Sequence, residues 1–403
     1  MNTAHLDNIQ NVLDSAVSLN KIAGLNLLIY KDEKKIGYWQ SGFADVENQK
    51  PFNSDTLCRM FSMTKPVTSV ASMMLLEEGK IDLHEELWHY LPEFKNLRIS
   101  TGKGRDSEIS KVWRPILIQD LLNMTSGYTY GAWGADCPAG EHLTSDLIND
   151  LNKDITGENK ITTQEFARRL SEIPVSFEPG TNYAYGLSAD IMGAVIEKVS
   201  GMKFSEFLKK RIFEPLEMND TAFYVPEEKQ KRLAKAYSSV EKDGKLQLEV
   251  FSSPNLGVSN DMKTPPSFES GGAGLCSSVK DYMKFARMLT NYGELNGRRL
   301  LQKKTVEYLS SARLRDNLQE CFNRNMEHFA GYTYCNFMRV AMEPGMCKAI
   351  TEKGEMGWDG WLGPYLSVDL TNQLAIVMTM QMTNAGTTDT TRKVKNIIYT
   401  SLT

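Results

Sequence analysis

A serine and a lysine three residues apart could supply a nucleophile and its base. Ser62 and Lys65 lie in the segment Phe61-Ser62-Met63-Thr64-Lys65-Pro66. If this segment opens a helix, the spacing places the hydroxyl and the amine on one helix face. A neutral lysine amine can accept the serine proton, and the N-terminus of a helix favours negative charge that develops nearby. The pair therefore predicts a serine acyl-transfer site.

The same Ser-x-x-Lys spacing occurs at five other places, so the surroundings of each match must decide which one is catalytic. The other Ser-x-x-Lys matches begin at Ser18, Ser100, Ser200, Ser239 and Ser277. They fall at expected helix ends, in a charged loop, in the polar turn 238–245 and, for Ser277, at the expected cap of a helix from Val279. Only Ser62 follows an apolar approach and opens a long apolar helix. The alternative for Ser62 is an N-cap serine followed by a surface lysine.

A tyrosine segment supplies a second candidate group. Tyr183 and Tyr185 lie in the run Pro179–Leu187, directly before an expected helix. A tyrosine at such a turn can present its phenol to a cleft. If Lys65 and other cations lower its pKa, the phenol of Tyr185 can carry the serine proton to a leaving group. The alternative is a pair of amphipathic tyrosines packed at a subdomain edge.

The third candidate is the segment Gly357-Trp358-Asp359-Gly360-Trp361. It lies on an expected strand over 358–362 that leads into a hairpin over 365–380. Glycines in a strand often let a second backbone or a ligand come close. The alternative is an aromatic edge strand with a tight bend.

The elements that must position these residues are strands at both ends of the chain and helices between them. Hydrophobic periodicity predicts an N-terminal amphipathic helix with Leu6, Ile9, Leu13, Ala16 and Val17 on one stripe. It also predicts strands over 24–30, 35–43, 331–340, 358–362, 365–368 and 374–380. Further helices are expected over 62–78, 118–124, 163–172, 188–199, 204–212, 279–291 and 389–402, the last with Asp389 as N-cap.

This order predicts an α/β (α+β) fold in which one antiparallel sheet is assembled from both chain termini. The α/β subdomain would comprise about residues 1–80 and 270–403, and a mainly helical subdomain would be inserted over about 81–269. The sequence has neither an internal repeat nor a Pro/Gly/Ser-rich linker. We therefore expect a single catalytic unit over 1–403 rather than separable domains.

Composition narrows the class of protein. The chain has 403 residues, of which 41% are hydrophobic and 24% charged, and its net charge is −4. It can bury a large core, and it offers no electrostatic reason to expect nucleic acid or an anionic membrane as partner. The first residues lack the pattern of a secretory signal, and no apolar stretch reaches about 18 residues. The expected location is cytoplasmic, with the six cysteines, none in a Cys-x-x-Cys pair, as free thiols.

Taken together and in this order, the three segments resemble the serine β-lactamase and penicillin-binding-protein superfamily. The chain is most similar to class C β-lactamases and family VIII carboxylesterases. Residues 121–127, Leu-Leu-Asn-Met-Thr-Ser-Gly, look like that family's LLxHTSG segment. The stretches Pro179-Gly180, Gly271–Leu275 and Asn296–Leu301 also have counterparts there, so the resemblance covers most of the chain.

The resemblance implies a role for each matching position. Ser62 would be the acylated nucleophile, Lys65 its proton acceptor, and Tyr185 the tyrosine of the family's Tyr-x-Asn element. Trp358, Asp359 and Gly360 would match the Lys/His-Thr/Ser-Gly triplet. The backbone amides of Ser62 and Trp361 would then form the oxyanion hole, where one donor typically contributes on the order of 100- to 1000-fold in rate. Tyr183 and the two Trp residues suggest an apolar acyl or aryl pocket.

Two positions depart from the family's β-lactamase pattern. Leu187 replaces the asparagine of Tyr-x-Asn, and Trp358 replaces the cation that begins the triplet; Asp359 adds negative charge nearby. Both changes weaken the case for β-lactam or D-Ala-D-Ala recognition and agree with the esterase branch. A literal Tyr-x-Asn at Tyr334-Cys335-Asn336 lies on an expected late strand and is interpreted as an accident.

The sequence therefore predicts a serine hydrolase that acts on small or apolar acyl esters. It would bind a small-molecule ester or amide and need neither metal nor organic cofactor. Alternatives within enzymes are a D-amino-acid peptidase, a weak β-lactamase or an acyltransferase. An alternative of another class is a catalytically feeble binder of acyl ligands or peptidoglycan fragments. The absence of a Gly-x-Ser-x-Gly elbow and the scarcity of histidines argue against other serine mechanisms.

Overall fold

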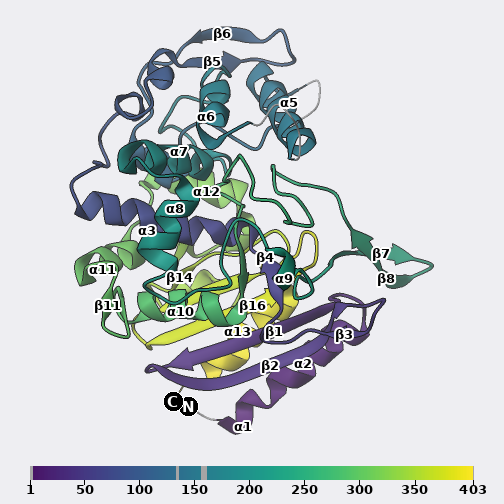
Figure 1. The fold of residues 1–403 in the computed structure, drawn as a ribbon. Coiled ribbons are helices and arrows are strands. Elements are labelled where there is room, and N and C mark those ends of the chain that lie inside the picture. The colour runs from purple at the N-terminus through teal and green to yellow at the C-terminus, as the bar shows by residue number, and fades with distance from the viewer. Residues whose placement is uncertain (1–2, 133–135, 156–160, 403) are drawn as a thin grey trace.

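The computed structural model describes residues 3–132, 136–155 and 161–402, and its centre is an eight-stranded antiparallel sheet (Figure 1). The strand order is β12-β13-β14-β15-β16-β1-β2-β3. The strands span Gly24–Lys31 (β1), Lys34–Asp45 (β2), Lys50–Pro51 (β3), Tyr332–Cys335 (β12), Met338–Ala341 (β13), Met356–Gly357 (β14), Tyr365–Asp369 (β15) and Leu374–Met380 (β16). Because β1 pairs with β16, the two ends of the chain meet inside one sheet, which confirms the predicted fold class.

Alternation along the central strands gives the sheet two apolar faces. Leu25, Leu27 and Ile29 of β1 point to one face, where α2 (Asn8–Ser18) and α13 (Asp389–Thr400) pack. Leu28 and Val377 point to the other face, which α10 (Val279–Thr290) covers. In Figure 1, α2 and α13 accordingly lie across the sheet from α10. Period-two alternation with both faces buried explains why these strands are apolar throughout.

The helix that follows Ser62 lies between the sheet side of the molecule and a mainly helical region (Figure 1). This helix, α3 (Thr64–Glu77), contacts α7 (Ser188–Ser200). The helical region also contains α4 (Ile118–Leu122), α5 (Ala139–Asp154), α6 (Thr163–Ser171), α8 (Phe204–Leu208) and a π-helical turn over Lys209–Phe213. Ser62 therefore lies at the boundary between the two regions.

Smaller elements complete the fold. Two-stranded pairs are β4 (Leu57–Arg59) with β9 (Cys276–Ser278), β5 (Arg98–Thr101) with β6 (Glu108–Lys111), β7 (Ala236–Lys242) with β8 (Lys245–Phe251), and β10 (Glu294–Leu295) with β11 (Arg298–Arg299). The remaining α-helices are α1 (Thr3–Leu6), α9 (Glu227–Gln230), α11 (Lys303–Ser311) and α12 (Asp316–Asn325). The β7–β8 hairpin projects from the body (Figure 1), where the sequence reading expected only a turn.

Four sequence-based predictions are wrong in detail. The expected strand over 331–340 is a hairpin, because Asn336 and Phe337 both adopt positive φ and reverse the chain between β12 and β13. The expected strand over 358–362 reduces to one bridge between Asp359 and Tyr365. The caps also shift by one residue: the Ser278 and Thr388 side chains, rather than Ser277 and Asp389, accept the capping N–H bonds of α10 and α13.

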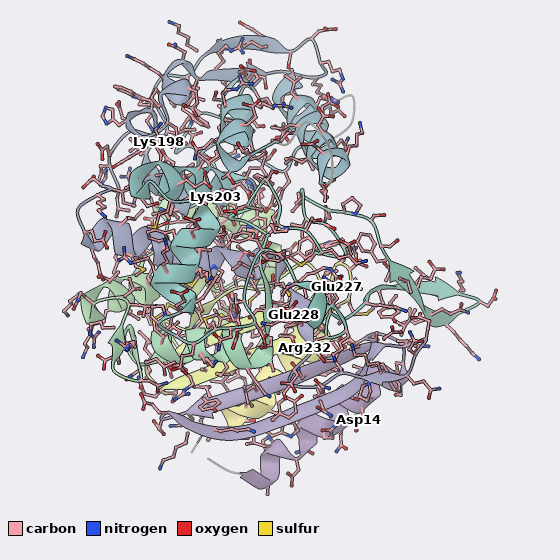
Figure 2. The ribbon with its side chains drawn as sticks, in the orientation of Figure 1. Asp14, Lys198, Lys203, Glu227, Glu228 and Arg232 are labelled. Carbon is pink, nitrogen blue, oxygen red and sulfur yellow. The ribbon has the colours of Figure 1, made fainter. Side chains whose placement is uncertain are left out.

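Charged side chains are spread over separate elements. Figure 2 labels Asp14 on α2, Lys198 on α7 and Glu227 on α9, which lie in different parts of the molecule. Among the described helices, none combines the length and the hydropathy that crossing a bilayer requires.

Candidate active site

Ser62 lies in a single 3-10 turn, Phe61–Met63, that leads directly into α3. The structure thus divides the predicted helix into two parts. Phe61 has φ +44°, a left-handed conformation that costs a residue with a Cβ about 1–3 kcal/mol. Pro66 falls in the first turn of α3, where its missing N–H removes no helical bond. A strained residue directly before the candidate nucleophile is a common feature of active sites.

Lys65 is completely buried, and its amine reaches the Ser62 hydroxyl. The Lys65 Nζ lies 3.3 Å from Ser62 Oγ, 2.9 Å from the Tyr130 hydroxyl and 2.9 Å from the Gly272 carbonyl oxygen. The sequence-predicted pair is therefore brought together. The alternative of a surface lysine behind an N-cap serine does not describe this geometry.

The surroundings of Lys65 favour its neutral form. Burial lowers the pKa of the amine to about 7, although the negative charges of Asp190 and Asp359 act in the opposite direction. Asp190 is itself buried and accepts hydrogen bonds from Ser270 Oγ at 2.5 Å and from the Gly272 N–H at 3.1 Å. Near neutral pH a large fraction of Lys65 can therefore act as a base.

A glycine-rich loop holds Lys65 against α7. The Gly271 carbonyl accepts a hydrogen bond from Thr68 of α3 at 2.7 Å, and the next carbonyl, of Gly272, accepts from Lys65. A Cβ on Gly271 would lie 2.2 Å from the Ala189 carbonyl oxygen of α7. Only glycine lets this backbone pass so close to the helix, which explains the glycine at position 271, in the stretch Gly271–Leu275.

Tyr130 is a site residue that the sequence analysis missed. It comes three residues after Gly127, the end of the LLxHTSG-like segment, and that position was the only signal. The LLxHTSG-like segment is held in place by two hydrogen bonds. Thr125 donates to the Asp120 carboxylate at 3.0 Å, and the Ser126 and Ser188 hydroxyls lie 2.8 Å apart. This segment therefore ties the chain before Tyr130 to the start of α7.

Tyr185 lies on the other side of Lys65. Its ring centroid is 4.6 Å from Lys65 Nζ and 5.7 Å from that of Tyr130. The Trp358 indole N–H donates a hydrogen bond to the Tyr185 hydroxyl oxygen at 2.7 Å. Trp358, which the resemblance matches to the Lys or His of the family's triplet, thus supplies a neutral donor that orients the phenol.

Both phenols are protonated near neutral pH. Burial raises the pKa of Tyr130 and of Tyr185 well above the ordinary tyrosine value, and hydrogen bonding with Ser62 offsets only part of the rise. The expectation that cations lower the Tyr185 pKa is therefore wrong for this structure. The reason is that burial removes the phenolate from water, and the negative charges of Asp359 and Asp190 raise the Tyr185 pKa further. Tyr185 can donate its proton but is a poor resting base.

The segment after Trp358 passes close to the chain before Ser62. A Cβ on Gly360 would lie 2.3 Å from the Met60 carbonyl oxygen, so glycine is required for this approach. In the described parts of the chain, the Trp361 N–H has no backbone acceptor. The Trp361 ring packs on Phe61 at 5.1 Å and on Phe251 at 5.3 Å. This amide and that of Ser62 are thus carried by segments in contact.

The other residues that the sequence analysis singled out are packed or hydrogen-bonded within the protein. Tyr183 is fully buried and packs on Phe322 and Tyr334, which favours a core role over contact with substrate. Leu187 is buried at the start of α7. Asp359 accepts a hydrogen bond from the Thr387 hydroxyl, and burial raises the pKa of its carboxyl. Tyr334, of the literal Tyr-x-Asn, is buried in β12 against Trp358, in agreement with its interpretation as an accident.

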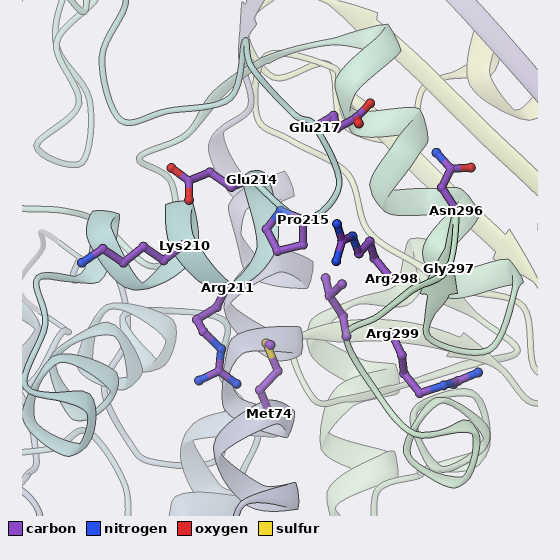
Figure 3. A pocket seen from close by; sticks show the side chains of 11 residues that line it. Met74, Lys210, Arg211, Glu214, Pro215, Glu217, Asn296, Gly297, Arg298 and Arg299 are labelled. Atoms are coloured by element: carbon purple, nitrogen blue, oxygen red, sulfur yellow. The ribbon is translucent and has the colours of Figure 1, made fainter.

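A cavity lies away from Ser62. It has a volume of about 670 Å³ and is lined by residues that include Met74, near the C-terminal end of α3 and about 15 Å along the helix axis from Thr64. Figure 3 shows Lys210, Arg211 and Arg298 around it. Arg211 is paired with Glu78. The described residues that line this cavity offer no nucleophile and base pair comparable to Ser62 and Lys65.

Known proteins resemble the chain over most of its length. Protein Rv1367c of Mycobacterium tuberculosis is 28% identical over 364 residues, covering 90% of this chain and 85% of that protein. Esterase EstB of Burkholderia gladioli is 28% identical over 288 residues, covering 68% and 67%.

The fold is shared with solved structures. EstCE1, described as a hydrolase with promiscuous acyltransferase activity, superimposes with a TM-score of 0.80 at 21% identity over 98% of this chain and 99% of that chain. Structural neighbours that share this fold also include penicillin-binding-protein homologues and a family VIII carboxylesterase. The match to a family model confirms the resemblance inferred from the motifs. Residues 9–398 match the family described as Beta-lactamase, and the chain belongs to that family.

Proposed function

We propose that this protein is a serine esterase that forms an acyl-enzyme on Ser62 and acts on small or apolar acyl esters. The observation that carries the proposal is the buried Lys65 amine, with a pKa of about 7, at 3.3 Å from the Ser62 hydroxyl. An uncharged amine at this place can accept the serine proton.

The contacts of Lys65 constrain where protons can lie. A neutral amine has two N–H donors and one lone pair. The Gly272 carbonyl can only accept, so it takes one donor. The second donor and the lone pair are left for the Tyr130 and Ser62 hydroxyls, and the state with Ser62 donating to the lone pair leads to proton transfer.

The proposed reaction has two steps, acylation of Ser62 and hydrolysis of the acyl-enzyme. As Ser62 Oγ bonds to the ester carbonyl carbon, its proton passes to Lys65 Nζ, and the amides of Ser62 and Trp361 stabilise the oxyanion. The bond from carbon to the leaving oxygen breaks as that oxygen takes the Tyr185 proton, and the Lys65 ammonium returns a proton to Tyr185. Water then attacks the acyl carbon as its proton passes to Lys65. The bond from that carbon to Ser62 Oγ breaks, Oγ takes this proton back from Lys65, and the free acid leaves.

Two substitutions favour esters over β-lactams. Leu187 has no side-chain amide to hold an acyl-amide group, and Trp358 directs its only polar atom at Tyr185 rather than at a substrate carboxylate. The partly exposed Trp361 ring beside Phe61 and Phe251 adds apolar surface near the same segment. An uncharged ester with a modest apolar acyl group fits this chemistry.

Hydrolysis of p-nitrophenyl butyrate and of nitrocefin tests the proposal. The wild type should hydrolyse the ester, with nitrocefin turnover far slower. Ser62→Ala should abolish ester turnover, and mass spectrometry should find a fluorophosphonate adduct on Ser62 alone. Ser69→Ala is the matched control, because Ser69 lies on the same helix and its buried hydroxyl has no hydrogen-bond partner among the described residues. Equal activity in Ser62→Ala and wild type would refute the proposal.

Transfer of the acyl group to an alcohol is a second candidate, favoured by the similarity to EstCE1. It uses the same acyl-enzyme with an alcohol in place of water. Turnover of p-nitrophenyl butyrate in the presence of a primary alcohol, with the products separated, distinguishes the two. A dominant ester product would assign transfer, and butyrate alone would assign hydrolysis.

A further inference from the structure

A buried group of charges lies beside the Trp358 segment. Arg339 on β13 and Lys395 on α13 both contact the Glu355 carboxylate, at 3.0 Å and 2.9 Å. All three side chains are at least 97% buried. We call these three residues the Arg339 cluster. One carboxylate faces two cations, so the cluster has one positive charge in excess, and buried charges are normally paired.

One donor of the cluster is unsatisfied. Arg339 Nη2 donates to Glu355, to the Tyr365 hydroxyl and to the Leu366 carbonyl. The other terminal nitrogen, Nη1, is buried and has no hydrogen-bond partner among the residues that the structure describes. An orphaned buried donor on a charged group is costly, so Nη1 calls for an acceptor.

A small cavity adjoins this group and is lined by further positive charge. Arg339 and Lys395 line it together with the cations Arg392 and Lys348, and its volume is about 20 Å³. His328 also lines it, but burial lowers the pKa of its imidazole, so this ring adds no positive charge near neutral pH. That volume is close to one water-sized sphere and too small for the five heavy atoms of phosphate or sulfate. The Thr391 side chain adds a hydroxyl to the lining.

The nearby carboxylates do not cancel the positive charge around the cavity. Glu355 already bonds both buried cations. Asp359 acts on Arg339 and on His328 from one side, and its carboxyl accepts the hydroxyl of Thr387. Against these two carboxylates stand four cationic side chains, of which Lys348 is exposed and therefore counts least.

We propose that a monatomic halide, chloride under ordinary conditions, binds in this cavity and accepts a hydrogen bond from Arg339 Nη1. A monovalent anion balances the excess charge of the Arg339 cluster and satisfies the orphaned donor. Its size matches the cavity, whereas water would satisfy the donor without balancing the charge.

The site would support the strand segment that carries the proposed catalytic groups. Arg339 Nη2 bonds the Leu366 carbonyl, and the Leu366 N–H bonds the Trp358 carbonyl. Phe329, which also lines the cavity, stacks on Trp358 with ring centroids 5.2 Å apart. Halide binding should therefore stabilise the fold around Trp358, independently of which substrate the protein accepts.

Halide titration of the full-length chain tests the site. Thermal unfolding is followed in sodium chloride, sodium bromide and sodium gluconate at constant ionic strength, and crystals grown in bromide are measured at the bromine edge. The expected result is a saturable rise in unfolding midpoint with chloride and bromide but not with gluconate. A bromine peak should lie within hydrogen-bond distance of Arg339 Nη1.

A matched pair of variants on α13 isolates the site. Arg392→Gln removes a lining cation, and Lys393→Gln removes the same charge from the exposed neighbouring position. Arg392→Gln should weaken halide binding on the order of tenfold, about the loss of one hydrogen bond to a charged group, and Lys393→Gln should not. Neither variant removes a buried residue of the Arg339 cluster, so both are expected to fold.

Three outcomes would overturn the inference. Stabilisation by gluconate equal to that by chloride would indicate general salt screening. Equal halide dependence in the two variants would place the ion elsewhere. A cavity that holds only water in bromide-grown crystals would show that the donor is satisfied without an anion.

Discussion

Lys65 shows how one side chain obtains its chemistry from its surroundings. Its spacing from Ser62 is local, but its pKa depends on complete burial and on the carboxylates of Asp190 and Asp359. Burial favours the neutral amine, and the two negative charges favour the ammonium. Because burial is the larger effect, the base is available near pH 7 rather than near 10.5.

The first prediction concerns Asp190→Asn. Ester hydrolysis by the wild type should rise with pH through about 7, as Lys65 loses its proton. Asp190 raises the Lys65 pKa, so its neutralisation should move this acid limb to lower pH, by on the order of one unit. The measurement is the pH profile of kcat/KM for p-nitrophenyl butyrate.

A matched control separates this effect from damage to the fold. Glu269→Gln neutralises another buried carboxyl that contacts Ser205 rather than Lys65. It should leave the acid limb in place. A limb that is unmoved in Asp190→Asn would mean that Asp190 does not act on the Lys65 charge.

The second prediction concerns Tyr130→Phe. The change removes the hydroxyl at 2.9 Å from Lys65 Nζ and keeps the ring against Tyr185. We expect kcat to fall about tenfold to 100-fold, since Lys65 loses one partner but keeps Ser62 and Gly272. Tyr185→Phe removes the proposed proton donor and should cost more. Steady-state kinetics on both variants check this order, and a larger loss in Tyr130→Phe would exchange the two roles.

At the scale of elements, glycines decide how closely segments approach. Gly271 lets the 271–274 loop contact α7, and Gly360 lets the Trp358 segment contact the chain before Ser62. Both contacts are with backbone carbonyls, which cannot rotate away as a side chain can. The segments that form the site can thus contact one another only because these two positions are glycine.

The third prediction tests this at Gly360. Gly360→Ala would place a Cβ 2.3 Å from the Met60 carbonyl oxygen and should displace the Trp361 amide from Ser62. We expect kcat to fall on the order of 100-fold, the cost of one misplaced oxyanion donor. Gly345→Ala is the control, because a Cβ there meets no atom within 4 Å. Unchanged kcat in Gly360→Ala would remove Trp361 from the proposed oxyanion hole.

The fourth prediction concerns the junction of β13 with α13. Glu355→Gln leaves Arg339 and Lys395 buried without their shared carboxylate, which should cost about 3–5 kcal/mol of unfolding free energy. Urea denaturation measures this loss. Glu352→Gln, at a more exposed position in the same loop, should change little.

The same carboxylate makes stability depend on acid. Despite its burial, the two cations lower the Glu355 pKa from 4.5 to about 2. As the pH falls, the Glu355 carboxylate therefore takes up a proton at a higher pH in the unfolded chain than in the folded protein. The stabilisation present above about pH 4.5 should be lost as the pH falls towards 2. A wild type whose acid sensitivity matched that of Glu355→Gln over this range would contradict the assignment.

At the scale of the whole molecule, interleaving of the chain ends closes the core on both sides of the sheet. β1 lies between β16 and β2, so the sheet cannot be completed by either terminus alone. Cys58 and Cys276 lie on the paired strands β4 and β9, and Cys335 lies on β12; all three are buried. Cys137, Cys321 and Cys347 are partly exposed.

The fifth prediction follows from this closure. A chromogenic disulfide reagent should modify at most the three partly exposed cysteines in the native protein and all six after denaturation. Cys347 should react slowly, because burial raises the pKa of its thiol to about 11. Rapid native reaction of Cys58 or Cys276 would show that the β4–β9 region opens more readily than its packing indicates.

Local sequence patterns predicted much of the fold and the pairing of Ser62 with Lys65. The Ser62–Lys65 spacing, the alternation in 24–30 and 374–380 and the helical periods of α6, α7 and α10 depend on neighbours a few residues away, which the sequence displays directly. The family's motifs added Tyr185 and Trp358. Turns were less certain, and the 331–341 hairpin was missed because Asn336 and Phe337 adopt positive φ without a glycine.

Tertiary structure alone decided the electrostatics and the pairing of distant groups. Three contacts join residues far apart in the chain: Tyr130 with Lys65, Trp358 with Tyr185, and Lys395 with Glu355. The pKa of Lys65 and of the two phenols depends on how completely water is removed, which no local pattern records. Residue type and spacing therefore determined which groups could react, and burial determined which of them hold protons.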